Sequence, residues 1–202
     1  MWEFIHKMKW VTPPVKPSLE IEKKFLLREE GNYYANILFT DTLVNSVKKL
    51  GAYCYQGYLH KADGDYLLNY LIRENYIKER KICFAINEYR LREKAYPNDP
   101  KKCNKWFFAI KSSGSLIRYE VEVEIQPAIF DKMWDFTNGR RVEKFVYSYG
   151  EPGNCMEIAN YIDRDLVIVE FETPSKASAN MIEFPGRDVT EISDYKNINL
   201  AR

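Results

Sequence analysis

The sequence has few of the residues from which zinc sites and disulfide frameworks are built. Its only histidines are His6 and His60, and its four cysteines form no CxxC pair. A structural zinc site needs about four Cys or His ligands at close spacings, so the sequence offers no zinc-finger pattern. Isolated cysteines are typical of reduced side chains in a cytosolic protein, and we therefore expect a cytoplasmic location.

Long apolar runs and a net charge of either sign are also lacking. The first residues, MWEFIHKMKW, contain no stretch long enough for a signal peptide or a membrane span, so no membrane partner is expected. The formal net charge is +1, which gives no general argument for binding nucleic acid or an anionic membrane. This balance hides a charged fraction of 29%, so the placement of the charges matters more than their sum.

The length and composition suit one folded domain. The chain has 202 residues, and 46% of them are hydrophobic, which is enough to build a core. Residues 1–17 mix aromatics with three prolines and are expected to form an N-terminal extension. Residues 18–202 are expected to form the domain itself, and no internal repeat is evident.

Alternation of apolar and polar residues predicts strands along most of the chain. There are eight candidate strands. The first begins at Ser18, and the others cover 53–59, 82–93, 105–112, 117–126, 141–149, 155–162 and 166–173. Helical patterns cover 40–50, 61–80 and 127–137; the first of these has Thr40 or Asp41 as its expected N-cap and Gly51 just past its end. Eight strands with few helices predict one mainly β domain, an antiparallel barrel or sandwich.

Charged side chains share faces on several of these strands, because side chains alternate across a strand. The shared faces carry Glu20, Glu22 and Lys24; Glu88, Arg90 and Arg92; Arg118, Glu120, Glu122 and Glu124; and Glu170 with Glu172. Lys111 and Lys144 lie on the strands at 105–112 and 141–149. Acids therefore group on some strands and bases on others.

Exposure to solvent explains each of these faces singly, since antiparallel strands often bury one face and expose the other. Together they favour another interpretation, because like charges directly opposed in a sheet repel by roughly 0.2–1 kcal/mol for each pair. If these faces lined the inside of a closed barrel, carboxylates would hold hard divalent cations, and Arg and Lys would bind phosphate oxygens. Such a polar interior requires water, ions or a ligand to satisfy it.

Seven motifs in order along residues 18–201 resemble the CYTH superfamily, also called triphosphate tunnel metalloenzymes. The motifs are ExExK at Glu20, Glu22 and Lys24; QGYL at 56–59; RxR at Arg90 and Arg92; Lys111 in FAIKSSG; RxExExE at Arg118, Glu120, Glu122 and Glu124; ExE at Glu170 and Glu172; and a closing segment from Asp188 through YKNINLA. ExExK alone is weak, whereas the ordered set is specific.

The resemblance implies an α+β, mainly β fold, an eight-stranded antiparallel closed β-barrel with surrounding helices. It implies hydrolysis of a triphosphate-containing small molecule with Mg²⁺ or Mn²⁺, and no nucleic-acid partner. Known members include thiamine, inorganic and RNA triphosphatases and class IV adenylyl cyclases. The implied metal ligands are Glu20, Glu22, Glu122, Glu124, Glu170 and Glu172. The implied substrate-binding residues are Lys24, Arg90, Arg92, Lys111, Arg118 and Lys144, and the implied catalytic residues are Lys24, Lys111 and Glu120.

The sequence departs from the family pattern in three places. Val146 stands where the family usually has an arginine, and the alignment places Ala159 at an aspartate position, which predicts reduced activity. A helical insertion at about 61–81 is expected to pack on the barrel or form a dimer contact, with a lid as the alternative. Binding without turnover, a cyclase and a vestigial scaffold remain open as functions, and the oligomeric state as monomer or homodimer.

Overall fold

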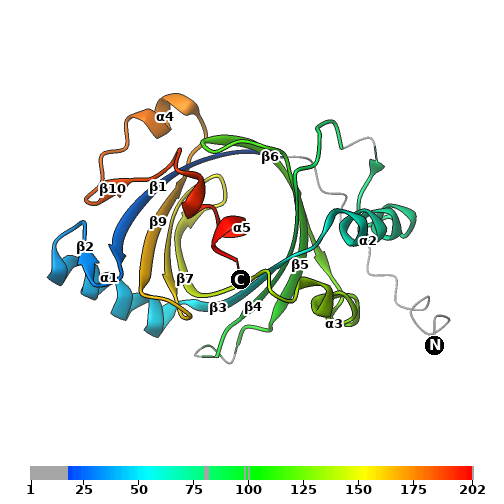
Figure 1. Ribbon diagram of the computed structural model, residues 1–202, viewed down its shortest axis with the longest axis horizontal. Coiled ribbons are helices and arrows are strands. Elements are labelled where there is room, and N and C mark those ends of the chain that lie inside the picture. Colours follow the sequence, from blue (N-terminus) through cyan, green and yellow to red (C-terminus); the bar gives the residue numbers. More distant parts are fainter. Residues whose placement is uncertain (1–17, 80–81, 98, 100, 202) are drawn as a thin grey trace.

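Eight antiparallel strands close into a barrel in the computed structural model, which describes residues 18–79, 82–97, 99 and 101–201. The strands are β1 (Ser18–Glu29), β3 (Ala52–Tyr58), β4 (Glu88–Ala95), β5 (Lys105–Lys111), β6 (Ile117–Ile125), β7 (Arg141–Glu151), β8 (Asn154–Tyr161) and β9 (Leu166–Glu172). Their order is β1-β6-β5-β4-β3-β7-β8-β9, and a further pairing of β9 with β1 closes the ring (Figure 1). The expected closed barrel is confirmed. Short strands β2 (Asn32–Tyr33) and β10 (Arg187–Asp188) pair with β1.

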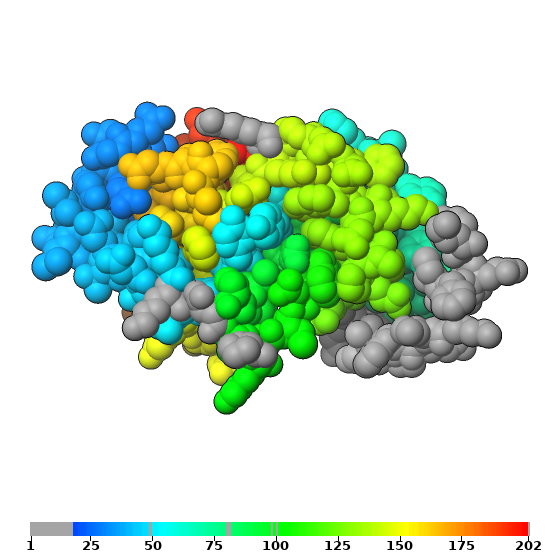
Figure 2. Space-filling view, turned by 90° about the horizontal axis from the view of Figure 1, so that it is seen from below, coloured from blue at the N-terminus to red at the C-terminus, as the bar shows by residue number. Residues whose placement is uncertain are grey.

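Among the described residues, five α-helices accompany the barrel, four outside the ring of strands and the last, at the C-terminus, within it (Figure 1). They are α1 (Ile37–Leu50), α2 (Lys61–Arg73), α3 (Pro127–Trp134), α4 (Lys176–Asn180) and α5 (Asn197–Leu200). Seen from below, α1 and α3 lie at opposite ends of one face, with the β3 and β4 part of the wall between them (Figure 2). None of the helices in the described part of the chain has the length and apolar character needed to cross a membrane.

The first helix begins earlier than the sequence pattern indicated. Asn36 is its N-cap, and the Asn36 side chain accepts a hydrogen bond from the Phe39 N–H at 3.1 Å. Thr40 was an expected cap, but its hydroxyl instead donates to the Asn36 carbonyl inside the first turn. An asparagine that accepts from the third helical N–H is as effective a cap as Thr or Asp, so the predicted start was wrong by one turn. Gly51 does follow the last helical residue.

Two further boundaries differ from the expected ones. The second helix ends at Arg73, just before Asn75, whose φ of 65° cannot continue a right-handed helix. The strand expected over 82–93 begins only at Glu88. The alternating apolar side chains of 82–86 instead pack against the core on the outside of the barrel, so packing rather than strand pairing explains their period.

Helix α2 packs on the outer wall of the barrel. Its Leu67, Leu68 and Leu71 join a buried cluster with the outward side chains of β4, β5 and β6. The helix approaches so closely that a Cβ added at Gly64 would overlap the ring of Tyr89. Figure 1 shows α2 outside the ring of strands.

The C-terminal segment closes one end of the barrel. Val189, Tyr195, Ile198 and Leu200 pack with apolar side chains that point inward from the strands. Helix α5 accordingly lies within the ring of strands when the molecule is viewed as in Figure 1. Burying this apolar layer stabilises the end of the barrel by the hydrophobic effect and separates the charged interior above it from solvent on that side.

Candidate active site

The barrel encloses a cavity of about 640 Å³ to which all eight strands contribute. This volume is in the range typical of small-molecule sites. The charged side chains that line it are Glu20, Glu22, Arg90, Arg92, Lys94, Lys111, Arg118, Glu120, Glu122, Lys144, Glu157, Glu170 and Glu172. Alternate residues of each strand point into the cavity, so the strand faces that carry charged residues in the sequence are the inward faces.

Two of the expected site residues do not line the cavity. Lys24 points inward like Glu20 and Glu22 but lies deeper in the barrel, next to the apolar layer that contains Leu26, and its buried ammonium group forms ion pairs with Glu22 and Glu170. Glu124 lies at the outer end of β6, where its carboxylate is about half exposed and pairs with Lys105 at 3.4 Å. Its position gives no support to the expected metal role, because Glu124 lies at the rim of the barrel and is not among the residues that line the cavity.

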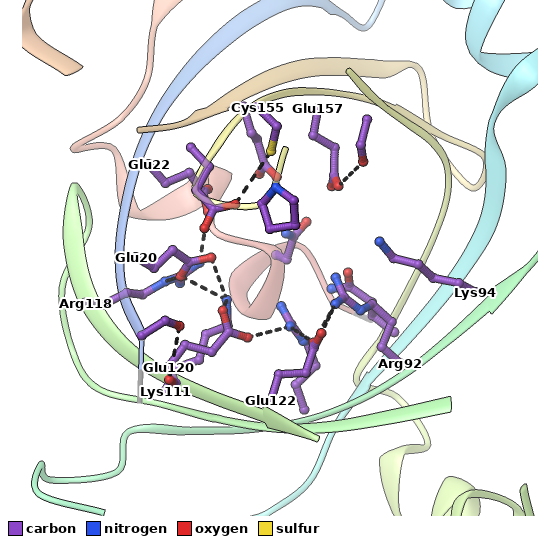
Figure 3. A pocket seen from close by; sticks show the side chains of 18 of the residues that line it. Glu20, Glu22, Arg92, Lys94, Lys111, Arg118, Glu120, Glu122, Cys155 and Glu157 are labelled. Carbon is purple, nitrogen blue, oxygen red and sulfur yellow. Dashed lines mark hydrogen bonds and ion pairs between the residues drawn. The ribbon is translucent and has the colours of Figure 1, made fainter. Parts of the chain in front are cut away.

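The cations of the cavity are held by carboxylates on adjacent and next-but-one strands (Figure 3). The Arg90 guanidinium donates to Glu120 and Glu122, each at 2.8 Å. The Lys111 ammonium lies 3.1 Å from Glu20 and 3.2 Å from Glu120. These side chains are therefore fixed in position before any ligand binds, which lowers the entropic cost of binding.

Arg118 and Arg92 complete this network. Arg118 donates to Glu20 and, at 3.3 Å, to Glu22 on the adjacent strand β1. Arg92 pairs with Glu122 at 2.5 Å. Burial opposes ionisation of Glu122, but Arg92 and Arg90 outweigh it and lower its pKa to about 2. The carboxylate of Glu122 consequently stays charged under all ordinary conditions.

A second cluster of buried charge lies between β1 and β9. Burial opposes ionisation of Glu170, but Lys24 and Lys144 lower its pKa to about 2. Burial and the neighbouring Glu170 carboxylate instead raise the pKa of Glu22. The Glu22 Oε1 atom is buried and accepts no hydrogen bond among the described residues, although it forms an ion pair with Lys24.

These carboxylates fit a hard divalent cation by their chemistry. Mg²⁺ and Mn²⁺ prefer oxygen ligands, and a cation would relieve the repulsion between Glu22 and Glu170 and satisfy Glu22 Oε1. The described residues contain no group of three or more His, Cys, Asp or Glu side chains already gathered as a metal site. The oxygen ligands are therefore of the type that these metals prefer, and in this structure the carboxylates form ion pairs with the lysine and arginine side chains of the wall.

The sequence pattern missed two inward charges, Lys94 and Glu157. Glu157 lies directly opposite Glu170 in the register of β8 and β9, and 3.8 Å from the Lys144 ammonium. It has the parity of Ala159, the position aligned with the family's aspartate, so the alternation of β8 could have found it. Lys94 continues the parity of Arg90 and Arg92 on β4 and could have been found in the same way.

The two departures from the family pattern lie side by side. Val146 on β7 is paired in register with Ala159 on β8, and both side chains are buried. Ala159 belongs to the apolar layer at the closed end of the barrel. This part of the wall therefore offers no charge to a ligand.

Comparison with known proteins agrees with this site. No family model matches the chain. The chain is 38% identical to an inorganic triphosphatase of Nitrosomonas europaea over 103 residues, which are 48% of this chain and 68% of that protein.

Solved structures similar to this chain include the inorganic triphosphatase NE1496, at 27% identity with 90% of this chain and 93% of that chain covered and a TM-score of 0.48. Another is PH1819 from Pyrococcus horikoshii OT3, at 18% identity with 80% and 82% covered and a TM-score of 0.42. The curated relative, the ordered motifs and the closed barrel around a charged cavity together establish that this chain belongs to the CYTH superfamily of triphosphate tunnel metalloenzymes.

Proposed function

We propose that this protein hydrolyses a triphosphate-containing small molecule inside the barrel, with inorganic triphosphate as the first candidate substrate. The observation that carries the proposal is the cavity wall, where six cations from four strands point into one enclosed space. Planar guanidinium forks and ammonium groups are the side chains that bind phosphate oxygens best. The name of the 38% identical relative, an inorganic triphosphatase, supports the same substrate class.

The cations have a defined role in this reaction. Arg90, Arg92, Lys111 and Arg118, on the consecutive strands β4, β5 and β6, would contact the phosphate oxygens on one side of the cavity, and Lys144 on β7 those on the other. Charge develops on the transferred and leaving phosphate oxygens during hydrolysis, and donors that are already positioned stabilise it without reorganising. Lys24 lies deeper in the barrel than the residues that line the cavity, so we assign it the positioning of Glu22 and Glu170 rather than contact with substrate.

Charge balance supports a requirement for divalent metal. Among the described residues, the cavity is lined by seven carboxylates and six cations, which nearly neutralise each other. A triphosphate adds several negative charges to this space, and burying them without further cations is unfavourable. Glu20, Glu22, Glu157, Glu170 and Glu172 would hold Mg²⁺ or Mn²⁺, and the metal supplies charge neutralisation to the phosphate oxygens when bound.

Glu120 is our candidate for orienting the attacking water. Its carboxylate lies in the cavity between Arg90 and Lys111, so a water that donates to it would be held beside the phosphate-binding cations. Burial raises the pKa of Glu120, although Lys111 and Arg90 oppose the shift. A carboxylate that accepts a proton more readily is better suited to accept one from water.

A product assay tests the proposal. The full chain is incubated with tripolyphosphate, ATP, GTP or thiamine triphosphate and with Mg²⁺ or Mn²⁺, and chromatography separates phosphate, diphosphate and cyclic nucleotide. We expect phosphate release from at least one substrate, abolished by EDTA. Glu22→Gln should lower kcat/KM by roughly a hundredfold or more, the effect of removing one group that stabilises transition-state charge.

Glu93→Gln is the matched control, since Glu93 lies on the outward face of β4, where Asn104 donates to it. It should leave kcat/KM within about twofold, as surface changes usually do. Metal-dependent turnover that survives in Glu22→Gln would contradict the proposed site. Cyclic nucleotide as the product would show a cyclase instead.

Binding without turnover is the second candidate function. The observation that favours it is the uncharged Val146 and Ala159 pair in the barrel wall. A charge-assisted hydrogen bond contributes roughly 1.5–3 kcal/mol, so a missing cation weakens a phosphate site without destroying it. Calorimetry that shows triphosphate binding together with no product in the assay would select this function.

A further inference from the structure

Lys94 extends the row of cations on β4 toward the open end of the cavity. Arg90, Arg92 and Lys94 share one parity, so all three point into the barrel. Figure 3 shows the Lys94 side chain reaching into the cavity beside Arg92. Its position is farther out than that of the other cations, because Arg90 is buried whereas Lys94 is half-buried and the neighbouring Lys105 side chain is 51% exposed.

Lys94 differs from the other cavity cations in its partners. Each of the other five forms an ion pair with a carboxylate, the longest being Lys144 with Glu157 at 3.8 Å. Lys94 has no hydrogen bond or ion pair within 18–79, 82–97, 99 and 101–201. Arg92 and burial lower the pKa of Lys94, and Glu157 acts on it only without a direct contact. A positive charge so placed is stabilised by an anion brought in from outside.

The lack of an internal partner affects the energetics of binding. When a phosphate binds Arg90 or Lys111, it competes with carboxylates that already hold those side chains. A phosphate that binds Lys94 breaks no such pair, so more of the interaction appears as affinity. Because Lys94 lies near the open end of the barrel, this gain in affinity comes from the part of the ligand that lies nearest that end.

We propose that Lys94 is a further substrate-binding residue, which contacts the phosphate group of a bound phosphate chain that lies nearest the open end of the barrel. The proposal rests on the proposed function. It makes the site sensitive to the length of the phosphate chain, because a chain that stops deeper in the cavity does not reach Lys94.

Calorimetry with two non-hydrolysable ligands tests this contact. Imidotriphosphate and imidodiphosphate are titrated, with Mg²⁺, into the full-length wild type, Lys94→Gln, Lys94→Arg and Lys105→Gln. We expect Lys94→Gln to weaken imidotriphosphate binding roughly tenfold or more, the value of a hydrogen bond to a charged group. Its effect on imidodiphosphate should be under about twofold. Lys94→Arg, which keeps the charge, should restore most of the affinity.

Lys105→Gln is the matched control, because it removes the same charge from the register partner of Lys94 on β5, at a side chain already paired with Glu124. It should change both affinities less than about twofold, as expected of an exposed charge. Thermal unfolding gives a second readout. Lys94→Gln should melt no lower than wild type without ligand, since it relieves repulsion from Arg92, but its stabilisation by imidotriphosphate should be smaller.

Equal losses of affinity for the two ligands would overturn the contact, since they would reflect the general field of the cavity. Wild-type affinity of Lys94→Gln for imidotriphosphate would overturn it as well. If the wild type binds neither ligand, the proposed function itself fails. If the wild type binds imidotriphosphate but Lys94→Gln binds it equally well, the proposed function stands and only the proposed Lys94 contact fails.

Discussion

Glu170 is the carboxylate whose removal tests whether charge holds the cavity wall together. It is buried, forms an ion pair with buried Lys24, and also attracts Lys144. Glu170→Gln keeps the size and shape of the side chain and removes its charge. Among the described residues, Lys24 is then left with Glu22 as its ion-pair partner.

The magnitude follows from the pKa of Glu170. Burial opposes ionisation, but Lys24 and Lys144 lower the pKa from 4.5 to about 2. One pKa unit corresponds to about 1.4 kcal/mol, so the ionised carboxylate contributes roughly 3 kcal/mol to the free energy of unfolding. Because the folded pKa is the lower one, this contribution is complete well above pH 4.5 and is lost as the pH falls toward about 2.

Urea unfolding in EDTA at pH 7 and pH 3 measures this contribution. We expect Glu170→Gln to lower the free energy of unfolding by roughly 3 kcal/mol at pH 7 and by about half as much at pH 3. Glu172→Gln is the control, since Glu172 has the same parity on β9 and forms no ion pair with the described residues; it should cost less than about 1 kcal/mol. The same loss at both pH values would refute the electrostatic reasoning and indicate altered packing.

Two further substitutions probe packing and thiol chemistry. Gly64→Ala should lower the free energy of unfolding by about 1–3 kcal/mol, because its Cβ would overlap the ring of Tyr89, and chemical denaturation measures this change. The control, Asn69→Ala on the exposed face of α2, should be neutral or slightly stabilising. Burial and Glu172 raise the pKa of Cys155 to about 11, so at pH 8 only about a thousandth of it is thiolate. Mass spectrometry after brief alkylation should find Cys155 unmodified while the exposed cysteines react, and Glu172→Gln should speed its reaction; equal rates for all would contradict this.

The inward faces of the strands were predictable because strand alternation is a simple rule. Once Glu20 and Glu22 share a face in β1, closing the sheet places both inside or both outside, and the ordered motifs decide which. The start of α1 was not predictable from the same rule, since Asn36, Thr40 and Asp41 are all competent caps and tertiary packing selects among them.

Site residues outside the family motifs were harder to find. Lys94 lies on the same strand face as Arg92, and Glu157 on the same strand face as Ala159. The family motif on β4, however, stops at Arg92, and the family alignment expects the β8 carboxylate at Ala159. Which carboxylate faces which cation depends on register between strands distant in sequence, and a single sequence carries no signal for it. The metal and substrate roles of these side chains remain predictions.

Closure of the ring by β1 and β9 has a consequence for how the chain folds. Lys24 and Glu170, which meet across this seam, are separated by 146 residues. During synthesis β1 has no β9 to pair with until the long stretch of chain between these two strands has also been made. Its unpaired edge is open to wrong partners in that interval, and bringing the distant strands together carries a loop-closure entropy. We therefore expect refolding in milliseconds to seconds, typical of topologies dominated by non-local contacts.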